Sequence, residues 1–395
     1  MRWLQRGAPR SSYAMSGARA GRVFRFAVAL GLAIVAAGTP RLHATATRAE
    51  DSAAARAPDE VAWSLLAVGD TGAKPWRIAR ARQVNARVAR ALTAEDLRAP
   101  ADVLVLLGDN FYPDGLRREE LEARVRGNLA EPFCRFLPAP DVACPMPSRA
   151  ARVLAVLGNH DHESPESPSL QRHAIPRMLP SWSVPERPVQ SIEVGGGVSL
   201  VLYDAHELAA AGSFAPLVEA VRASPGPWRI AIGHHPLTQR ESDVLGRAAR
   251  AALAGVDAPL HLHLAGHRHY LELARADRPP FLQAIAGSGS NVRPLKEPLE
   301  GSFFQLAQPG FARVDLVRGA DGDRLVVSLF ALSGHRRLGG ARAEVVARGS
   351  VGLEGGAREE PVGGAETPPA EYPPGDRLDS MGMSAGRRAT DQSVK

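Results

Sequence analysis

Residues 103–112 read Val-Leu-Val-Leu-Leu-Gly-Asp-Asn-Phe-Tyr, five apolar residues that stop at a glycine and an aspartate. Such a run, bounded by a turn residue, predicts a strand buried on both faces. Four further motifs likewise combine a glycine with carboxylate, amide or imidazole side chains. They are Gly69-Asp70-Thr71-Gly72, Gly158-Asn159-His160-Asp161-His162, Gly233-His234-His235-Pro236 and Gly266-His267-Arg268-His269.

Short apolar runs of this kind continue along the chain. Helical patterns at 79–97 and 116–129 lie between the early runs, and this alternation predicts an α/β fold with helices covering a sheet. The later runs follow one another more closely, which indicates a second, partly antiparallel sheet. The expected strands are 63–68, 103–107, 153–157, 198–203, 230–232, 260–264, 281–285, 312–317 and 325–330.

The polar motifs follow expected strands at their carboxyl ends, where ligand sites of open α/β sheets lie. Oxygen and imidazole side chains gathered there suit two metal ions about 3.5–4 Å apart, an arrangement that hydrolyses phosphate esters. A shared carboxylate holds two cations at this spacing, and Asp109 is our candidate bridge. Asp70 is a candidate terminal ligand. The amide and neutral imidazoles that complete the shell are Asn159, His234, His267 and His269.

In this order the motifs resemble those of the purple acid phosphatases, within the wider calcineurin-like metallophosphoesterase family. They are most similar to the small, tartrate-resistant type, over about residues 61–332. The resemblance implies a four-layer α/β sandwich, in which two mixed β-sheets are flanked by helices, as a catalytic domain over 61–335. It implies that His160 binds substrate and protonates the leaving oxygen. It assigns the first metal to Asp70, Asp109, Tyr112 and His269, and the second to Asp109, Asn159, His234 and His267.

One exchange points to the subfamily. Generic members of the family carry a histidine two residues after the first aspartate, whereas this chain has Gly72, and Tyr112 would supply the missing ligand. A phenolate favours a hard trivalent ion, so the resemblance implies iron(III) at the first site and iron, zinc or manganese at the second. The chain also departs from the pattern. His235 replaces a usual tyrosine, and Asp243 stands where mammalian-type enzymes have a second substrate-binding histidine. His162 or His235 could substitute for that histidine, or either could support neighbouring residues.

We therefore expect a hydrolase: an exported binuclear-metal acid phosphatase that cleaves small phosphate monoesters through a metal-activated water. A phosphodiesterase on the same scaffold is the alternative within enzymes. A non-catalytic envelope protein that binds phosphate or metal is the alternative outside them. A regulatory protein phosphatase fits less well, because related phosphatases carry aspartate at the position of Tyr112.

The N-terminus reads as a secretory signal peptide over residues 1–46. It carries seven arginines, no acidic residue and a 13-residue apolar run at 26–38, too short for an ordinary membrane span. An uncleaved interfacial anchor is the alternative. Without these arginines the chain has 41 basic and 42 acidic residues, so the pI near 9.8 gives no case for nucleic-acid binding. We expect a periplasmic or secreted monomer with no stable membrane insertion after signal removal.

Other segments have structural interpretations. Residues 47–60 are expected to form a linker, and residues 336–395, poor in apolar anchors, a disordered tail. Cys134 and Cys144 could form a disulfide or remain free thiols. His261 and His263 are expected to have structural, hydrogen-bonded roles, and Trp182 and Trp228 to pack in the core or a loop. Scattered histidines expected at the surface or in loops are His173, His206 and His335. Asp204 is expected to form a turn, with bracing of the site as the alternative.

Overall fold

The computed structural model describes residues 59–73, 79–149, 152–277, 280–333 and 342–362. The expected signal peptide, the linker up to residue 58, His335 and residues 363–395 lie outside this part of the chain. All the described residues belong to one unit of the chain, residues 55–395.

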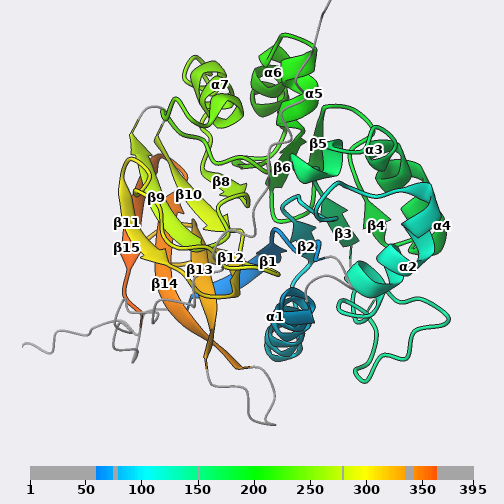
Figure 1. Ribbon diagram of the computed structural model, residues 1–395. Coiled ribbons are helices and arrows are strands. Elements are labelled where there is room, and N and C mark those ends of the chain that lie inside the picture. Colours follow the sequence, from blue (N-terminus) through cyan, green and yellow to red (C-terminus); the bar gives the residue numbers. More distant parts are fainter. Residues whose placement is uncertain (1–58, 74–78, 150–151, 278–279, 334–341, 363–395) are drawn as a thin grey trace, which may run out of the picture. The chain divides into compact units, whose positions relative to one another are not determined.

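The strands form two mixed sheets (Figure 1), as predicted. In the first sheet, of order β15-β14-β13-β12-β1-β2-β3-β4, strands β1 to β4 run parallel and β12 to β15 pair antiparallel. Its strands are β1 (Glu60–Val68), β2 (Val103–Leu106), β3 (Arg152–Ala155), β4 (Trp182–Ser183), β12 (Gly310–Arg318), β13 (Arg324–Ser333), β14 (Arg342–Gly352) and β15 (Gly355–Glu360).

The second sheet has the order β11-β9-β10-β8-β7-β6-β5. Strands β6, β7, β8 and β10 are parallel, and β5, β9 and β11 pair antiparallel at the two sides. Its strands are β5 (Val189–Glu193), β6 (Val198–Tyr203), β7 (Trp228–Ile232), β8 (Leu262–Ala265), β9 (Leu271–Asp277), β10 (Pro280–Ala286) and β11 (Ser302–Leu306).

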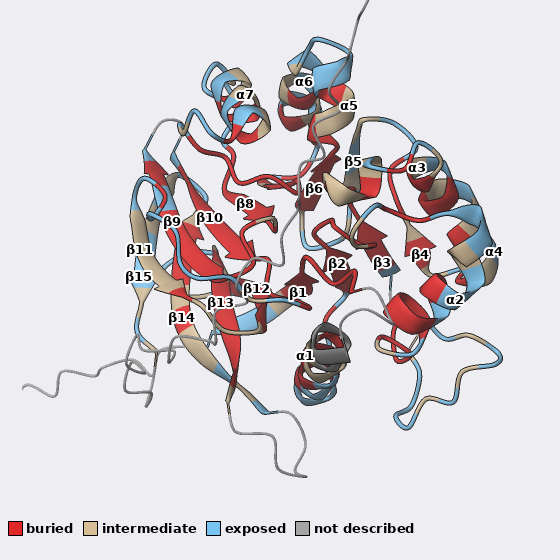
Figure 2. Ribbon diagram, in the orientation of Figure 1, coloured by how far each residue is buried: buried red, intermediate tan, exposed pale blue. Residues whose placement is uncertain are grey.

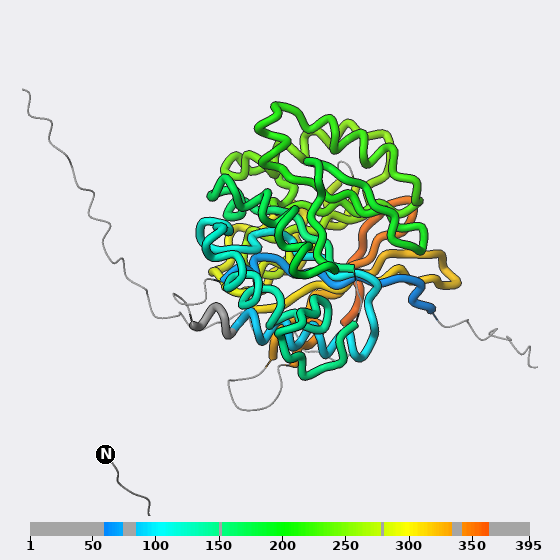
Figure 3. The backbone as a smooth tube through the Cα atoms, turned by 90° about the vertical axis from the view of Figure 1, so that its right-hand side faces the viewer, coloured from blue at the N-terminus to red at the C-terminus, as the bar shows by residue number. Residues whose placement is uncertain are grey.

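Helices cover the outer face of each sheet. In Figure 3, the green segment with α5 and α6 lies on the opposite side of the strands from the blue helix α1. Among the described residues, no helix combines the length and apolar content needed to cross a membrane. The α-helices are α1 (Ala79–Arg98), α2 (Leu121–Val125), α3 (Ser167–Ser169), α4 (Ile175–Met178), α5 (Ala205–Ala210), α6 (Ala215–Ala223) and α7 (Val244–Leu253).

Three apolar cores separate the four layers. Along β1, Leu65 and Ala67 belong to the core between the two sheets, whereas Leu66 and Val68 belong to the core beneath α1. Successive side chains of a strand point to opposite faces, so a strand covered on both sides is apolar throughout. A third core joins the second sheet to α5, α6 and α7. Figure 2 shows the central strands of both sheets buried, the outermost strands partly exposed, and the helices exposed on their outer faces.

The predicted strands were found, but the prediction for the C-terminal region is wrong in part. Residues 342–360, expected to be disordered, form β14 and β15, which extend the first sheet beyond β13. Strand β14 is exposed or half-buried over its first residues and is buried mainly from Ala347 to Val351. Its polar and glycine residues gave no clear strand pattern in the sequence. The predicted helix over 116–129 is also divided, into a 3₁₀ turn, α2 and a π-helical turn.

Cys134 and Cys144 form a disulfide, which decides between the two alternatives left open by the sequence. The bond joins two cysteines ten positions apart, in the segment that follows the π-helical turn at Arg126–Ala130. Trp182 and Trp228 are buried in the apolar cores, as expected. These features hold the scaffold on which the polar loops are mounted.

Candidate metal centre

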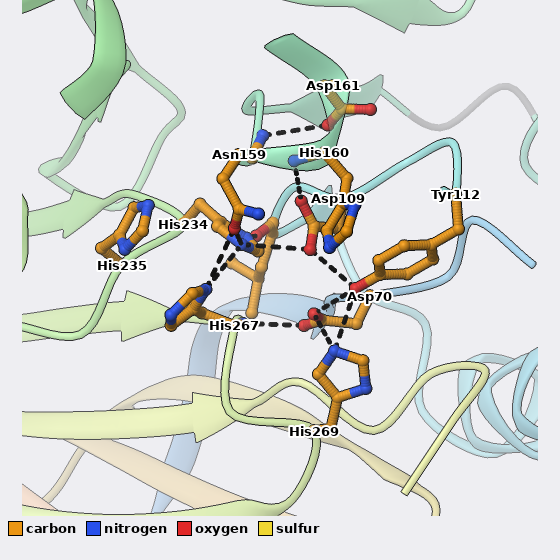
Figure 4. Close-up of polar contacts among 12 residues, drawn as sticks. Asp70, Asp109, Tyr112, Asn159, His160, Asp161, His234, His235, His267 and His269 are labelled. Atoms are coloured by element: carbon orange, nitrogen blue, oxygen red, sulfur yellow. Dashed lines mark hydrogen bonds and ion pairs between the residues drawn. The ribbon is translucent and has the colours of Figure 1, made fainter. Parts of the chain in front are cut away.

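The polar motifs lie where parallel strands of the two sheets end. Strands β1, β2 and β3 are adjacent and parallel, and the loops after them carry Asp70, Asp109 and Asn159. Strands β7 and β8 are adjacent in the second sheet, and the loops after them carry His234 and His267. The structure brings together all eight residues that the sequence singled out (Figure 4).

The first group of side chains surrounds the hydroxyl of Tyr112. That oxygen lies 2.7 Å from Asp70 Oδ1, 2.6 Å from Asp109 Oδ2 and 3.1 Å from His269 Nε2. His269 Nε2 lies 3.2 Å from Asp70 Oδ1. A phenol oxygen, two carboxylates and an imidazole nitrogen therefore converge on one point. His269 Nδ1 is buried and has no hydrogen-bond partner among the described residues.

The second group shares Asp109 with the first. His234 Nε2 lies 3.4 Å from Asp109 Oδ2 and 3.2 Å from Asn159 Oδ1. His267 Nδ1 lies 3.1 Å from the same Asn159 oxygen and 3.3 Å from His234 Nε2. His234 Nδ1 donates to the carbonyl of Leu107 at 2.8 Å, which leaves Nε2 free to bind a metal. Asp109 thus lies between both groups, where a bridging ligand would be needed.

The packing around position 72 favours glycine over the histidine of generic family members. A Cβ atom at Gly72 would lie 2.4 Å from the backbone nitrogen of Phe111, so any larger residue would push the two loops apart. The close approach allows the Tyr112 N–H to donate to the carbonyl of Gly72 at 2.6 Å. Glycine at 72 is therefore what brings Tyr112 against the carboxylates.

Asp161 fixes two of the loops, a role that sequence reasoning missed. Its buried carboxylate accepts hydrogen bonds from the backbone N–H groups of Gly158, Asn110 and Phe111 at 2.9–3.1 Å, and from the amide of Gln171 at 2.9 Å. The loops after β2 and β3 are thereby joined. The acidic residue within the Asn-His-Asp-His motif was the available signal.

The buried ionisable groups of the site shift one another's pKa values. Burial, and after it the charge of Asp109, raise the pKa of Asp70 to about 7. Burial opposes the ionisation of Asp109, but the imidazole of His234 outweighs it and lowers the pKa of Asp109. Burial and the same two carboxylates raise the pKa of Tyr112 well above 10. The Tyr112 phenol therefore stays uncharged, and, against the opposing effect of burial, the carboxylate of Asp109 raises the pKa of His234 to about 10, so a proton on His234 offsets the charge of Asp109.

The remaining imidazoles are ready to act as ligands. Burial lowers the pKa of His267 to about 2 and that of His269 to about 3, so both rings are neutral at physiological pH. Neutral imidazoles and ionised carboxylates are the forms that bind divalent and trivalent metals. Among the described residues, Asp70, Asp109 and His234 form one of the groups whose spacing could hold a metal ion.

Further polar residues line the second group. His162 Nε2 donates to Asp204 at 2.8 Å, and Asp204 also caps the start of α5 by accepting from the His206 and Glu207 N–H groups. The expectation that His206 is an isolated surface or loop residue is wrong, because its half-buried ring stacks on His162 with centroids 4.9 Å apart. His173 is exposed, as expected.

The chain belongs to the calcineurin-like phosphoesterase family, whose model matches residues 64–271. The fold of this family implies a site for two metal ions, and the donors described above suit one. No curated protein matches the chain in sequence.

Solved structures share the fold at low identity. GAP50, the anchor in the inner membrane complex of Plasmodium, is 14% identical, and the match covers 69% of this chain and 85% of that chain (TM-score 0.52). PhoD is 11% identical over 78% and 74% of the two chains (TM-score 0.50). The purple acid phosphatase PPD1 from yellow lupin (Lupinus luteus) seeds is 12% identical over 72% and 53% (TM-score 0.48).

Proposed function

We propose that the chain is an exported binuclear-metal acid phosphatase of the purple, tartrate-resistant type that hydrolyses phosphate monoesters. The observation that carries the proposal is the position of the Tyr112 hydroxyl, 2.6–2.7 Å from both Asp70 and Asp109. A generic member of the family would have no phenol at this point. A phenolate beside two carboxylates supports iron(III) there, with iron, zinc or manganese in the second group.

The ligand assignment follows the two groups. Asp70, Asp109, Tyr112 and His269 would hold the first ion, and Asp109, Asn159, His234 and His267 the second. When bound, the two ions would neutralise the phosphate oxygens and supply a water nucleophile at near-neutral pH. The seven protein groups would fix the spacing of the ions.

His160 would bind the substrate and protonate the leaving alcohol. Its Nδ1 donates to the carbonyl of Pro113, and its ring packs edge-on against Tyr112 with centroids 4.6 Å apart. The ring is therefore fixed, and Nε2 remains available to hold the proton that the leaving oxygen needs. General acid catalysis of this kind contributes about 10²–10⁴-fold to a rate.

Paired substrates test the proposal. We expect turnover of p-nitrophenyl phosphate by the wild type, much slower turnover of bis(p-nitrophenyl) phosphate, and loss of both in Asp109→Ala. His160→Gln should lower kcat for an alkyl phosphate far more than for p-nitrophenyl phosphate, because nitrophenolate leaves without a proton. His173→Gln, an exposed substitution, is the control. Preference for the diester would favour a phosphodiesterase, and metal binding without turnover would favour a non-catalytic binding protein.

The visible spectrum tests the metal assignment separately. A broad violet band that is present in the wild type and lost in Tyr112→Phe would support iron(III) on the phenolate. A colourless protein that binds two metals and cleaves esters would contradict the purple subtype and leave a generic binuclear phosphoesterase. Export is tested by expressing the full chain in a bacterial host and sequencing the N-terminus of the product. We expect residues 1–46 to have been removed.

A further inference from the structure

The environment of His235 differs from that of an ordinary buried histidine. Its side chain is only 8% exposed, and neither ring nitrogen has a hydrogen-bond partner among the described residues. An imidazole always carries at least one N–H group, and a buried polar group without a partner costs about 1–3 kcal/mol. A purely structural histidine would be expected to have its nitrogens paired.

The position of the ring indicates what could satisfy it. His234, His235 and His267 each offer one ring nitrogen, and these three nitrogens lie within 4.8 Å of one another. The His235 ring is centred 4.4 Å from that of His267 and 5.2 Å from that of His234. Figure 4 shows His235 on the side of His267 that faces away from Tyr112. A cation held by His234 and His267 would therefore have a third imidazole close by.

A carboxylate lies beside the ring. Asp243 Oδ1 is 3.3 Å from His235 Nδ1, within ion-pair range although not aligned as a hydrogen bond. Asp243 is itself fixed, because it accepts from the Gly246 N–H at the start of α7 at 3.0 Å. Histidines that bind metals commonly present one nitrogen to the ion and the other to a carboxylate, which orients the ring. Asp243 can fill that role for His235.

We propose that His235 is an additional protein ligand of the second metal ion, oriented by Asp243. The inference rests on the proposed function, because it needs the second ion. It also narrows which metal that second ion is. Imidazole suits zinc and iron, whereas carboxylate, carbonyl and water suit manganese. A third imidazole therefore favours zinc or iron(II) over manganese at this position.

Cobalt-loaded protein allows the ligands to be counted directly. The full chain, freed of metal by chelation, is titrated with Co²⁺ and followed by calorimetry and by proton NMR. Each imidazole bound to Co²⁺ gives an exchangeable N–H resonance shifted outside the normal range. We expect His235→Gln to lose one such resonance and to bind the second Co²⁺ about 10- to 100-fold more weakly. Zn²⁺ affinity should fall more than Mn²⁺ affinity.

His206→Gln is the matched control, because the His206 ring also packs against His235, with ring centroids 5.6 Å apart. It should keep every shifted resonance. If His235→Gln also keeps them all, whether or not its affinity changes, His235 only packs against His267 and the proposal is overturned.

If His235→Gln does not fold, Asp243→Asn is used in its place. If every shifted N–H resonance of Asp243→Asn then stays at its wild-type position, the proposal is overturned. A wild type that binds no metal would contradict the proposed function itself.

Discussion

Two His-x-His pairs lie six residues apart and behave in opposite ways. His263 lies in strand β8 and His261 immediately precedes it. Each ring nitrogen of the two residues has a protein partner. The backbone N–H of Arg229 donates to His261 Nδ1, and His261 Nε2 donates to the Leu353 carbonyl. His263 Nδ1 donates to the Gln283 side chain at 2.9 Å, and its Nε2 accepts from Tyr203 at 2.9 Å. The predicted structural role of this pair is confirmed.

His267 and His269 follow the same strand but lie in its terminal loop. Both have left-handed backbones, with φ of 69° and 52°, and Asp70 and Asp109 share this conformation. Left-handed conformations of this kind cost about 1–3 kcal/mol each and cluster at functional sites. His267 Nδ1 lies beside Asn159 and His234. His269 Nε2 lies beside Tyr112 and Asp70, so each ring faces one of the two ligand groups. Identical residues at identical spacing thus serve the core in one case and the site in the other, according to where the strand stops.

Exchanging one histidine of each pair should separate activity from stability. We expect His267→Ala to lower phosphatase activity on the order of 10³-fold or more, because an ion worth several kcal/mol of transition-state stabilisation loses a ligand. Its melting temperature without metal should stay near that of the wild type. Steady-state kinetics and metal analysis on the same sample measure this. Full activity in His267→Ala would remove the functional half of the comparison.

The matched change in the other pair should act on folding. His263→Ala leaves the buried Tyr203 hydroxyl without its partner, removes one hydrogen bond to Gln283 and opens a cavity. We therefore expect a loss of about 3 kcal/mol in the free energy of unfolding. Activity measured well below the melting temperature should remain close to that of the wild type. Urea unfolding of metal-free protein is the measurement, with His173→Gln as control. A loss of activity in a stably folded His263→Ala protein would mean that the two pairs are coupled.

The free energy of unfolding should also depend on pH through the core histidine His263. Burial lowers the pKa of His263 to about 3, against 6.5 for an ordinary histidine. Between these values the unfolded chain binds the proton more readily, so the contribution of neutral His263 is present above pH 6.5 and is lost as pH falls toward 3. The slope reaches at most about 1.4 kcal/mol per pH unit. In His263→Gln, unfolding free energy should fall less steeply with acid. Parallel pH profiles for the two proteins would contradict this assignment.

The sequence allowed prediction of the site better than of its surroundings. Residues such as Asp109 and His234 closely follow apolar runs that end at a glycine, so the end of each strand and the convergence of the loops could be anticipated. Contacts between distant segments could not. The stacking of His206 on His162 depends on where α5 begins, and the nearness of Asp243 to His235 depends on where α7 begins. The fold was predicted where strands are apolar and buried throughout, but not at β14 and the edge strand β15, where many residues are half-buried or exposed.

Relieving the strain of the loop pair gives the smallest expected effect. His269→Gly should raise the free energy of unfolding of the metal-free protein by about 1 kcal/mol, because glycine adopts a φ of 52° without the Cβ cost. The gain is reduced by the greater entropy of glycine in the unfolded chain. His261→Gly, at a position of the core pair that has no positive φ, should instead destabilise. Urea unfolding with a chelator present compares them. If His269→Gly destabilised the metal-free protein as much as His261→Gly does, the imidazole would be contributing to folding, and the division between a strained site pair and a stabilising core pair would fail.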